Sequence, residues 1–161
     1  MKPEYLKSRK LVGENRYFAI FFDSLEENKG TSVEDYVVVH PKKKTKEGVY
    51  AITILPILND KVGLLEIFRH PLEENLWESP GGFIENEESG QTSALRELRE
   101  ESGLICELKN LHDLGIVSTS PSTIAAKVQL FAATDCKLST EGRQPELGHG
   151  RFQWFSKSDI N

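Results

Sequence analysis

The amino-acid sequence predicts a one-domain α/β (α+β) protein, built as a mixed α/β/α sandwich. Short aromatic and β-branched segments, which are typical of strands, lie on both sides of one clear amphipathic helix. The chain has 161 residues, which is enough for one sizeable core. It contains no internal repeat and no Pro/Gly/Ser-rich linker. We therefore expect the strands and the helix to share one layered core.

Four strands are predicted before the helix, over residues 17–22, 36–40, 49–58 and 62–68. A polar stretch that includes Gly30 separates the first two and predicts a turn. The segment Asn59-Asp60-Lys61 separates the last two and indicates a hairpin. Pro56 has no amide proton to donate, so it predicts a bulge or an edge within its strand.

The clearest helix is predicted over residues 89–102. Ser89 suits the N-cap, and Gly103 suits the left-handed residue that follows a helix. Ala94, Leu95 and Leu98 recur at helical spacing and predict the buried face. Further strands are predicted over residues 127–133 and 152–155, and residues 156–159 have the pattern of a helix start.

The composition argues against several classes of protein. No apolar run approaches the roughly 20 residues of a membrane helix, and the first residues lack the apolar segment of a secretory signal. We therefore expect a cytoplasmic protein with no membrane partner. The net charge of −5 argues against a nucleic-acid polymer as the main partner. Cys106 and Cys136 are expected to be reduced, packed thiols. The basic run at residues 42–46 is interpreted as a solvated loop, with phosphate binding as the alternative.

Three glutamates crowd the C-terminal end of the predicted helix. Glu97 and Glu101 are four residues apart and share one face, and Glu100 lies beside them. Like charges at this spacing repel each other. The helix dipole adds a penalty on the order of 0.3–1 kcal/mol for each exposed acidic side chain in the last turn. The sequence therefore places an unfavourable cluster where a basic side chain is expected.

Two interpretations of this cluster are open. Arg96 and Arg99 can neutralise the glutamates and leave a solvated face. The alternative is a bound cation, which the acidic loop ending at Glu88 and the pair Gly81-Gly82 favour. Glycines let the backbone approach a metal or a phosphate closely. Because oxygen ligands suit a hard cation, we expect Mg²⁺, with Mn²⁺ as a substitute.

The same residues carry a resemblance to a known family. Gly82 is followed by five residues and Glu88, then by seven residues and Arg96-Glu97-Leu98-Arg99-Glu100-Glu101-Ser102-Gly103-Leu104. This pattern resembles the Nudix box at every fixed position, and a chance match has odds on the order of one in 10⁸ per starting point. The resemblance implies a Nudix-type α/β/α sandwich with a mixed sheet and an added N-terminal antiparallel sheet.

The resemblance also implies roles for the residues of the box. Positions matching Glu97, Glu100 and Glu101 supply metal ligands in the family, and the backbone carbonyl at the position of Gly81 adds another. Residues matching Glu88 and Arg96 pair to brace the loop against the helix, and that structural role is the preferred interpretation for both.

The flanking segments resemble the ADP-ribose and nucleoside diphosphate-sugar pyrophosphatases. By similarity, Arg69 is a candidate phosphate ligand, with a surface ion pair to Glu73 or Glu74 as the alternative. Glu78 is expected near the metal cluster, with a plain surface carboxylate as the alternative. Ser120 begins a segment that resembles a substrate loop of the subfamily. Its Ser-Pro-Gly pattern is altered here by Ser122, and Ala126 stands where an acidic residue is usual.

The remaining candidates are a general base and aromatic side chains that hold the nucleotide base. The polar, Gly-rich segment at residues 141–150 precedes a predicted strand, and Glu146 is the preferred general base. Glu100 and Glu101 are the fallback, and Glu141 and His149 compete for the role. Tyr17, Phe18 and Trp77 are candidates for base stacking, and for each a place in the core is the favoured alternative.

The predicted function is Mg²⁺-dependent hydrolysis of the pyrophosphate linkage of nucleoside diphosphate sugars, to a nucleoside monophosphate and a sugar phosphate. One alternative is a nucleoside triphosphate or dinucleoside polyphosphate hydrolase. Another is a non-catalytic nucleotide-sugar sensor, which retention of all the box carboxylates disfavours. Residues 1–45 are predicted to form N-terminal strands that pair in a homodimer, and residues 46–161 the catalytic domain.

Overall fold

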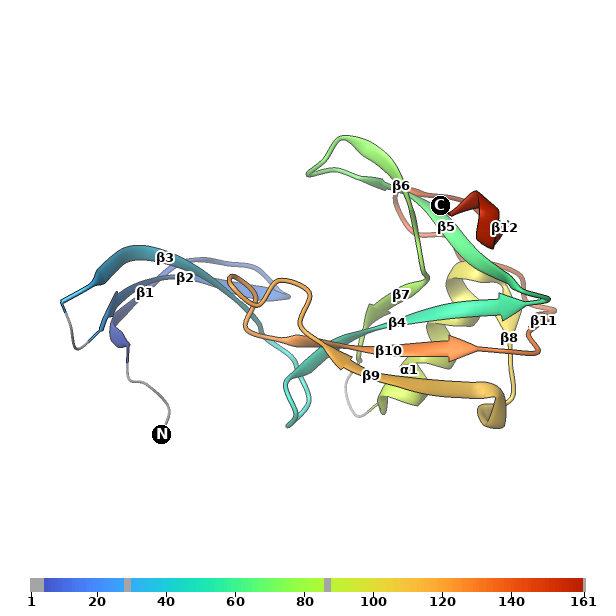
Figure 1. Cartoon of the computed structure of the whole chain (residues 1–161), viewed down its shortest axis with the longest axis horizontal. Coiled ribbons are helices and arrows are strands. Elements are labelled where there is room, and N and C mark those ends of the chain that lie inside the picture. Colours follow the sequence, from blue (N-terminus) through green and yellow to red (C-terminus); the bar gives the residue numbers. More distant parts are fainter. Residues whose placement is uncertain (1–4, 28–29, 86–87, 161) are drawn as a thin grey trace. The chain divides into compact units, whose positions relative to one another are not determined.

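The structure is a computed structural model that describes residues 5–27, 30–85 and 88–160. The chain divides into two units by its internal contacts (Figure 1). The first comprises Met1–Tyr50 and Ser118–Lys127, and the second comprises Ala51–Val117 and Val128–Asn161. The predicted boundary after residue 45 stays a prediction.

The first unit is built on a three-stranded antiparallel sheet of order β1-β2-β3. Its strands are β1 (Leu6–Glu14), β2 (Phe18–Glu26) and β3 (Ser32–Pro41). The N-terminal antiparallel sheet expected from the family resemblance is therefore confirmed. The turn predicted between β2 and β3 includes residues 28 and 29, which lie outside the described residues.

An ion pair fixes the register of the first two strands. Arg9 and Asp23 are opposite each other in the β1–β2 ladder, and the guanidinium donates to both carboxylate oxygens at 2.8 and 2.7 Å. Asp23 is only 3% exposed. The Arg9 guanidinium beside Asp23 lowers the pKa of that carboxyl. A two-pronged pair of this kind opposes slippage of the strand, because a shifted register would leave a buried charge without its partner.

The second unit contains a seven-stranded mixed sheet of order β12-β5-β4-β10-β9, to which β6 is added beside β5 and β7 beside β4. The strands are β4 (Val49–Leu58), β5 (Lys61–Arg69), β6 (Glu74–Glu78), β7 (Gly81–Phe83), β9 (Leu111–Val117), β10 (Lys127–Ala133) and β12 (His149–Ser156). The short strands β8 (Leu104–Ile105) and β11 (Lys137–Leu138) form a separate pair. The strands predicted around the helix are all present, and β4 contributes its first two residues to the first unit.

The hairpin predicted at residues 59–61 is confirmed. Leu58 pairs with Lys61, and the two turn residues Asn59 and Asp60 both have positive φ, at 48° and 61°. Positive φ at both central positions is the requirement of the tight hairpin turn that Asn and Asp favour. Pro56 lies inside β4 between its pairing with β7, at residues 51–53, and its pairing with β5, at residues 57–58. The residue without an amide proton therefore lies where β4 changes its partner strand from β7 to β5.

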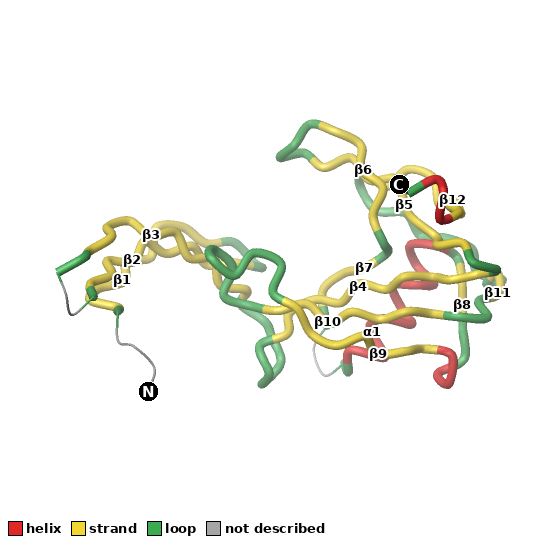
Figure 2. Tube along the Cα trace, viewed as in Figure 1, coloured by secondary structure: helices red, strands yellow, loops and turns green. Residues whose placement is uncertain are grey.

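The predicted helix divides into an α-helix and a π-helical turn. Helix α1 (Gly90–Glu97) is followed directly by η1 (Leu98–Ser102), and Gly103 closes it at φ 71° in the left-handed region. Ala94 and Leu98 are fully buried, whereas Leu95 is half-buried. Figures 1 and 2 show this helical segment within the second unit, where α1 packs against β7. It is the longest helical run of the described residues, and it carries the second half of the sequence pattern that resembles the Nudix box.

The predicted start of a last helix is a single 3-10 turn, η3 (Lys157–Asp159), held by a capping box. Ser156 donates a hydrogen bond through its backbone amide to Asp159 at 2.6 Å. No helix in the described part of the chain combines the length and the apolar character needed to cross a bilayer.

Candidate functional site

The beginning of α1 is fixed by side chains of the preceding loop. The Ser89 hydroxyl accepts from the amide of Thr92 at 3.1 Å, which confirms the predicted N-cap. Glu88 accepts from the hydroxyl of Ser93 at 2.6 Å and from the Arg96 guanidinium at 3.1 Å through each of two nitrogens. The Arg96 guanidinium beside Glu88 lowers the pKa of that carboxyl to about 2. The pair predicted to brace the loop is therefore in contact in the structure.

The arginines of the box also contact two of the three clustered glutamates. Arg96 donates to Glu97 at 2.7 Å and to Glu100 at 3.2 Å. Arg99 donates to the other oxygen of Glu100 at 3.0 Å and to Glu141 at 2.6 Å. Neutralisation by Arg96 and Arg99, one of the two interpretations of the cluster, is thus seen for Glu97 and Glu100.

Glu101 has a different environment. It is 5% exposed, and its Oε2 accepts a hydrogen bond of 2.6 Å from the amide of Gly81. Its Oε1 lies 3.4 Å from Nε2 of His149, and the side chains of the two residues are each 6% exposed. Burial raises the pKa of Glu101 to about 8, against the lowering effect of the Gly81 amide. A charged carboxylate here is expensive to bury unless a cation compensates it.

Glu97 is buried against the second glycine of the pair. Its residue is 8% exposed, and burial raises the pKa of its carboxyl. A Cβ atom placed on Gly82 would lie 2.2 Å from Oε1 of Glu97, so no other residue fits there without displacing the carboxylate. Gly82 pairs with Ile52 in the β4–β7 ladder, which holds this backbone in place beside the helix.

The donor atoms of these side chains are of the kind that a hard divalent cation prefers. The donors are carboxylate oxygens. The carboxylates of Glu97 and Glu101 are buried, and the backbone of Gly82 lies close to the carboxylate of Glu97. Within residues 5–27, 30–85 and 88–160, no group of three or more His, Cys, Asp or Glu side chains is arranged as a metal cage. In this conformation Arg96 lies between Glu97 and Glu100 and contacts both. The Nudix family typically uses a divalent metal.

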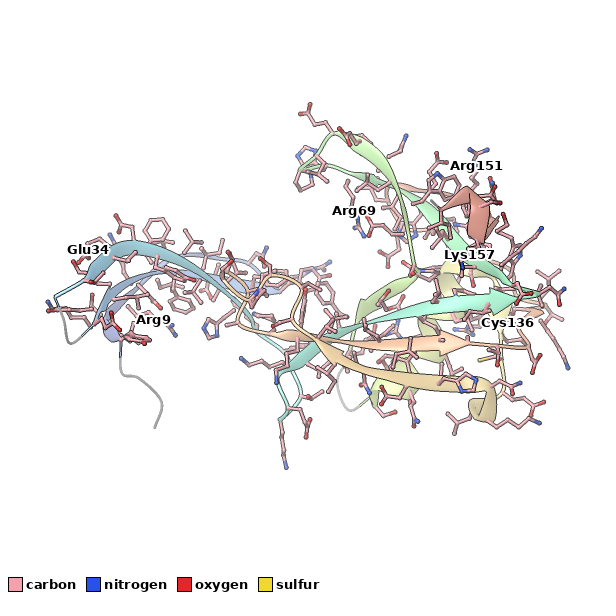
Figure 3. The ribbon with its side chains drawn as sticks, in the orientation of Figure 1. Arg9, Glu34, Arg69, Cys136, Arg151 and Lys157 are labelled. Carbon is pink, nitrogen blue, oxygen red and sulfur yellow. The ribbon has the colours of Figure 1, made fainter. Side chains whose placement is uncertain are left out.

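Arg69 and Glu78 form a two-pronged ion pair. The guanidinium donates to both carboxylate oxygens at 2.7 and 2.8 Å. The partner is thus Glu78 rather than Glu73 or Glu74, the alternative that the sequence suggested. In the β5–β6 register Arg69 is opposite Glu74, and Glu78 lies four residues further on the same face. Arg69 is the last residue of β5 (Figure 3), and its positive charge also lowers the pKa of Glu101.

Trp77 packs against aromatic and cationic neighbours. Its ring meets Phe155 edge to face with centroids 4.8 Å apart, and the guanidinium of Arg151 lies 5.3 Å from its centroid. These contacts join Trp77 of β6 to two residues of β12, and its role as a substrate ligand stays a prediction.

The loop before β12 contributes residues that the sequence analysis did not assign. Arg143 donates to the backbone carbonyl of Glu101 at 2.6 Å and to that of Gly150 at 3.0 Å. The amide of Gln144 donates to the carbonyl of Glu100 at 2.7 Å. Carbonyls at a helix end need such partners. Nothing in the sequence pattern distinguishes Arg143 from a loop cation, because its partners are backbone atoms distant in the chain.

Glu146 lies in the same exposed loop. Its amide donates to Nδ1 of His149 at 3.3 Å, and the amide of His149 donates back to the Glu146 carbonyl at 3.1 Å. The negative charge of Glu146 raises the pKa of both Glu97 and Glu101, so the three carboxylates belong to one electrostatic neighbourhood. Of the competing bases, Glu141 is held by Arg99 and His149 contacts Glu101.

Three predicted substrate ligands belong to the first unit. Tyr17 stacks under the guanidinium of Arg16, whose carbon is 4.4 Å from the ring centroid. Phe18 meets Tyr50 edge to face at 6.2 Å. Ser120 accepts at its backbone carbonyl from the amide of Ile124 at 2.8 Å, in a turn. Their roles as substrate ligands stay predictions.

Known proteins resemble the chain over most of its length. A methanol dehydrogenase activator of Bacillus methanolicus is 32% identical over 123 residues, which cover 76% of this chain and 61% of that protein. An ADP-ribose pyrophosphatase of Bacillus subtilis (strain 168) is 26% identical and covers 85% and 69%, respectively. An ADP-sugar pyrophosphatase of Mus musculus is 31% identical and covers 63% and 49%. The chain thus spans about half to two thirds of the length of these relatives.

A solved structure and a family match agree with this resemblance. The crystal structure of an ADP compounds hydrolase superposes with a TM-score of 0.76 at 22% identity, over 99% of this chain and 81% of that one, and so shows the same fold. The NUDIX domain matches residues 49–161, which is well over half of the chain. The chain belongs to the Nudix hydrolase family.

Proposed function

We propose that the protein hydrolyses the pyrophosphate linkage of nucleoside diphosphate sugars, of the ADP-ribose and GDP-mannose type, with Mg²⁺ as the cofactor and Mn²⁺ as a substitute. The observation that carries the proposal is the burial of Glu97 and Glu101 beside Gly81 and Gly82. Desolvated carboxylates at a helix end destabilise the fold, and their retention is understandable where they bind a cation. The printed names of two relatives, an ADP-ribose and an ADP-sugar pyrophosphatase, support this substrate class.

In the proposed reaction, water attacks one phosphorus of the diphosphate bridge, a new P–O bond forms, and the bridging P–O bond breaks. Glu97, Glu100, Glu101 and the carbonyl of Gly81 would hold the metal. When bound, the metal lowers the pKa of a water molecule and neutralises charge on the phosphates. Arg69 would exchange its contact with Glu78 for one with the pyrophosphate, because its planar fork fits two phosphate oxygens.

Glu146 is the proposed general base. It lies on an exposed loop next to His149 and close enough to Glu97 and Glu101 to raise the pKa of both. Ser120, Tyr17, Phe18 and Trp77 stay candidates for contacts to the nucleotide. The homodimer expected through the N-terminal strands stays a prediction that light scattering after size exclusion tests.

A substrate panel tests the proposed function. ADP-ribose, GDP-mannose and ADP-glucose are compared with dGTP and a diadenosine polyphosphate at several Mg²⁺ concentrations, and the products are separated by anion exchange. We expect kcat/KM for at least one nucleotide sugar to exceed that for dGTP by about tenfold or more, and EDTA to abolish turnover. Preference for dGTP or the dinucleotide would instead support the alternative hydrolase, and tight binding by calorimetry without product would support the sensor.

The general base is tested with a matched pair of variants in the same loop. Glu146→Gln removes the proposed proton acceptor, so kcat is expected to fall by about 10²–10³ with little change in KM. Glu141→Gln loses only the contact with Arg99, and its kcat is expected to stay within about threefold of the parent. Equal losses in the two variants, or a loss only in Glu141→Gln, would remove Glu146 from this role.

A further inference from the structure

Two cysteines of the second unit adjoin a short strand pair: Cys106 follows β8, and Cys136 precedes β11. In the antiparallel pair of β8 and β11, Ile105 is opposite Lys137 and Leu104 is opposite Leu138. The same register, continued by one residue, places Cys106 opposite Cys136. Both thiols are free and half-buried, and they influence each other: Cys136 lowers the pKa of Cys106, and Cys106 raises that of Cys136. Directly opposed positions of antiparallel strands bring side chains close enough for covalent pairing.

A cavity opens beside this pair. It has a volume of about 410 Å³, and its lining includes Cys106 and both chain neighbours of Cys136, which are Asp135 and Lys137. Lys109 adds a second cation to the lining, where it pairs at 2.8 Å with Glu107, a second lining carboxylate. Cys136 itself is turned toward the backbone, with its sulfur 3.5 Å from the carbonyl of Ala133 (Figure 3). The lining therefore includes one cysteine, next in sequence to neither lysine, and side chains with charges of both signs.

We propose that Cys106 and Cys136 form a dithiol modification site that closes to a disulfide by exchange with a small zwitterionic disulfide admitted by the cavity. Lys109 and Lys137 suit the carboxylates of such a molecule, and Asp135 suits its ammonium groups. The proposal does not depend on the hydrolase function, because none of these residues belongs to the glutamate cluster.

The exchange balances in two steps. The Cys106 sulfur, after losing its proton to water, attacks the small disulfide, forms a mixed disulfide and releases one small thiol. The Cys136 sulfur then attacks the Cys106 sulfur, breaks the mixed bond and releases the second small thiol. The protein loses two hydrogens, and the small disulfide gains them. Burial raises the pKa of both cysteines, that of Cys136 to about 12, so the exchange is slow and is followed over hours.

A disulfide between the two cysteines would stabilise the end of the helical segment formed by α1 and η1. Strand β8 begins directly after Gly103, and the amide of Ser139, just past β11, donates to the Gly103 carbonyl at 2.8 Å. A bond between Cys106 and Cys136 would make this attachment covalent and would close a loop of about 30 residues in the unfolded chain, which favours the folded state.

The test uses the full chain, glutathione disulfide and intact-mass spectrometry, with Cys106→Ser and Cys136→Ser as matched variants. The parent is expected to lose the mass of two hydrogens and to retain no glutathione. Cys136→Ser is expected to retain one glutathione on Cys106, because its resolving sulfur is missing. The closed parent should melt about 5 °C or more above the reduced parent, and dithiothreitol should reverse the shift.

Three outcomes would overturn the proposal. The first is a parent that keeps two glutathiones per chain, the second is a parent that does not close within one chain, because it forms only linked dimers or does not react, and the third is a closed form that melts below the reduced protein. The last would mean that the bond is incompatible with the β8–β11 register. Because the chain contains two cysteines, the mass change assigns the bond without further mapping.

Discussion

Replacing Glu101 with glutamine is expected to lower kcat by about 10³ or more at saturating Mg²⁺, since it removes a carboxylate proposed to hold the metal. The substitution is well matched to the site. An amide oxygen can still accept from the backbone of Gly81, whose amide lies 2.6 Å from Oε2, so the geometry of the turn is retained. The expected loss is therefore a loss of charge rather than of shape.

The same substitution is expected to change stability in the opposite direction. The folded pKa of Glu101 is raised from 4.5 to about 8. Between these values the folded protein keeps a proton that the unfolded chain has released, so stability falls as pH rises. With EDTA present, the parent should lose on the order of 3 kcal/mol of unfolding free energy between pH 4.5 and pH 8 through this group. Glu101→Gln lacks this contribution and should be the more stable protein at pH 8.

Urea unfolding at pH 5 and pH 8 in EDTA, together with steady-state kinetics in Mg²⁺, measures both effects. Glu107→Gln is the control, because that exposed carboxylate pairs with Lys109 and lies outside the cluster. It should leave kcat and the pH dependence unchanged. A Glu101→Gln variant with parental kcat, or with the parental loss of stability toward pH 8, would contradict the proposed metal site.

Local chemistry let the sequence predict much of the fold. The cap at Ser89, the left-handed Gly103 and the turn at Asn59-Asp60 depend on residues next to one another, so each follows from its own short segment. The buried face of the helix was predicted for the same reason, at Ala94 and Leu98.

Strand β1 and the π-helical turn were not predicted. The residues of β1, Leu6–Glu14, are mostly exposed and alternate weakly, so they carry little of the period-two pattern that marks a half-buried strand. Its position depends on the pairing of Arg9 with Asp23, which joins residues distant in the chain. In the π-helical turn, the Ser102 hydroxyl donates to the Leu98 carbonyl and Arg143 donates to the Glu101 carbonyl. Helix propensity includes neither contact.

The site shows the same division. The sequence named the glutamates and the brace, because the box fixes their spacing. It missed the partners that determine how each carboxylate behaves: the Gly81 amide and His149 for Glu101, and Glu78 for Arg69. Glu78, Gly81 and His149 lie on β6, β7 and β12, respectively, which are separated in the chain and joined in one sheet. A short sequence pattern does not include such contacts.

Replacing Gly82 with alanine is expected to separate catalysis from folding. The added Cβ would lie 2.2 Å from Oε1 of Glu97, at the far end of a flexible side chain that can move aside. The protein should therefore fold with a loss of about 1–2 kcal/mol, as for other cases of overpacking. The displaced carboxylate would also leave Arg96, which now donates to it at 2.7 Å. We expect kcat to fall by about 10² or more, because one ångström of misplacement is costly at a reacting centre.

The neighbouring glycine supplies the contrast. A Cβ on Gly81 would lie 2.4 Å from the carbonyl oxygen of Ile52 and 2.9 Å from Cα of Thr53, and these backbone atoms of β4 cannot yield as a side chain does. Gly81→Ala should cost about 3 kcal/mol or more. Gly13→Ala, which meets no atom within 4 Å, should change neither property. Unfolding midpoints and kcat for the three variants test this order. If Gly82→Ala kept the parental kcat, Glu97 would not be held where the chemistry needs it, and its burial beside the glycine pair would have to be explained by packing alone.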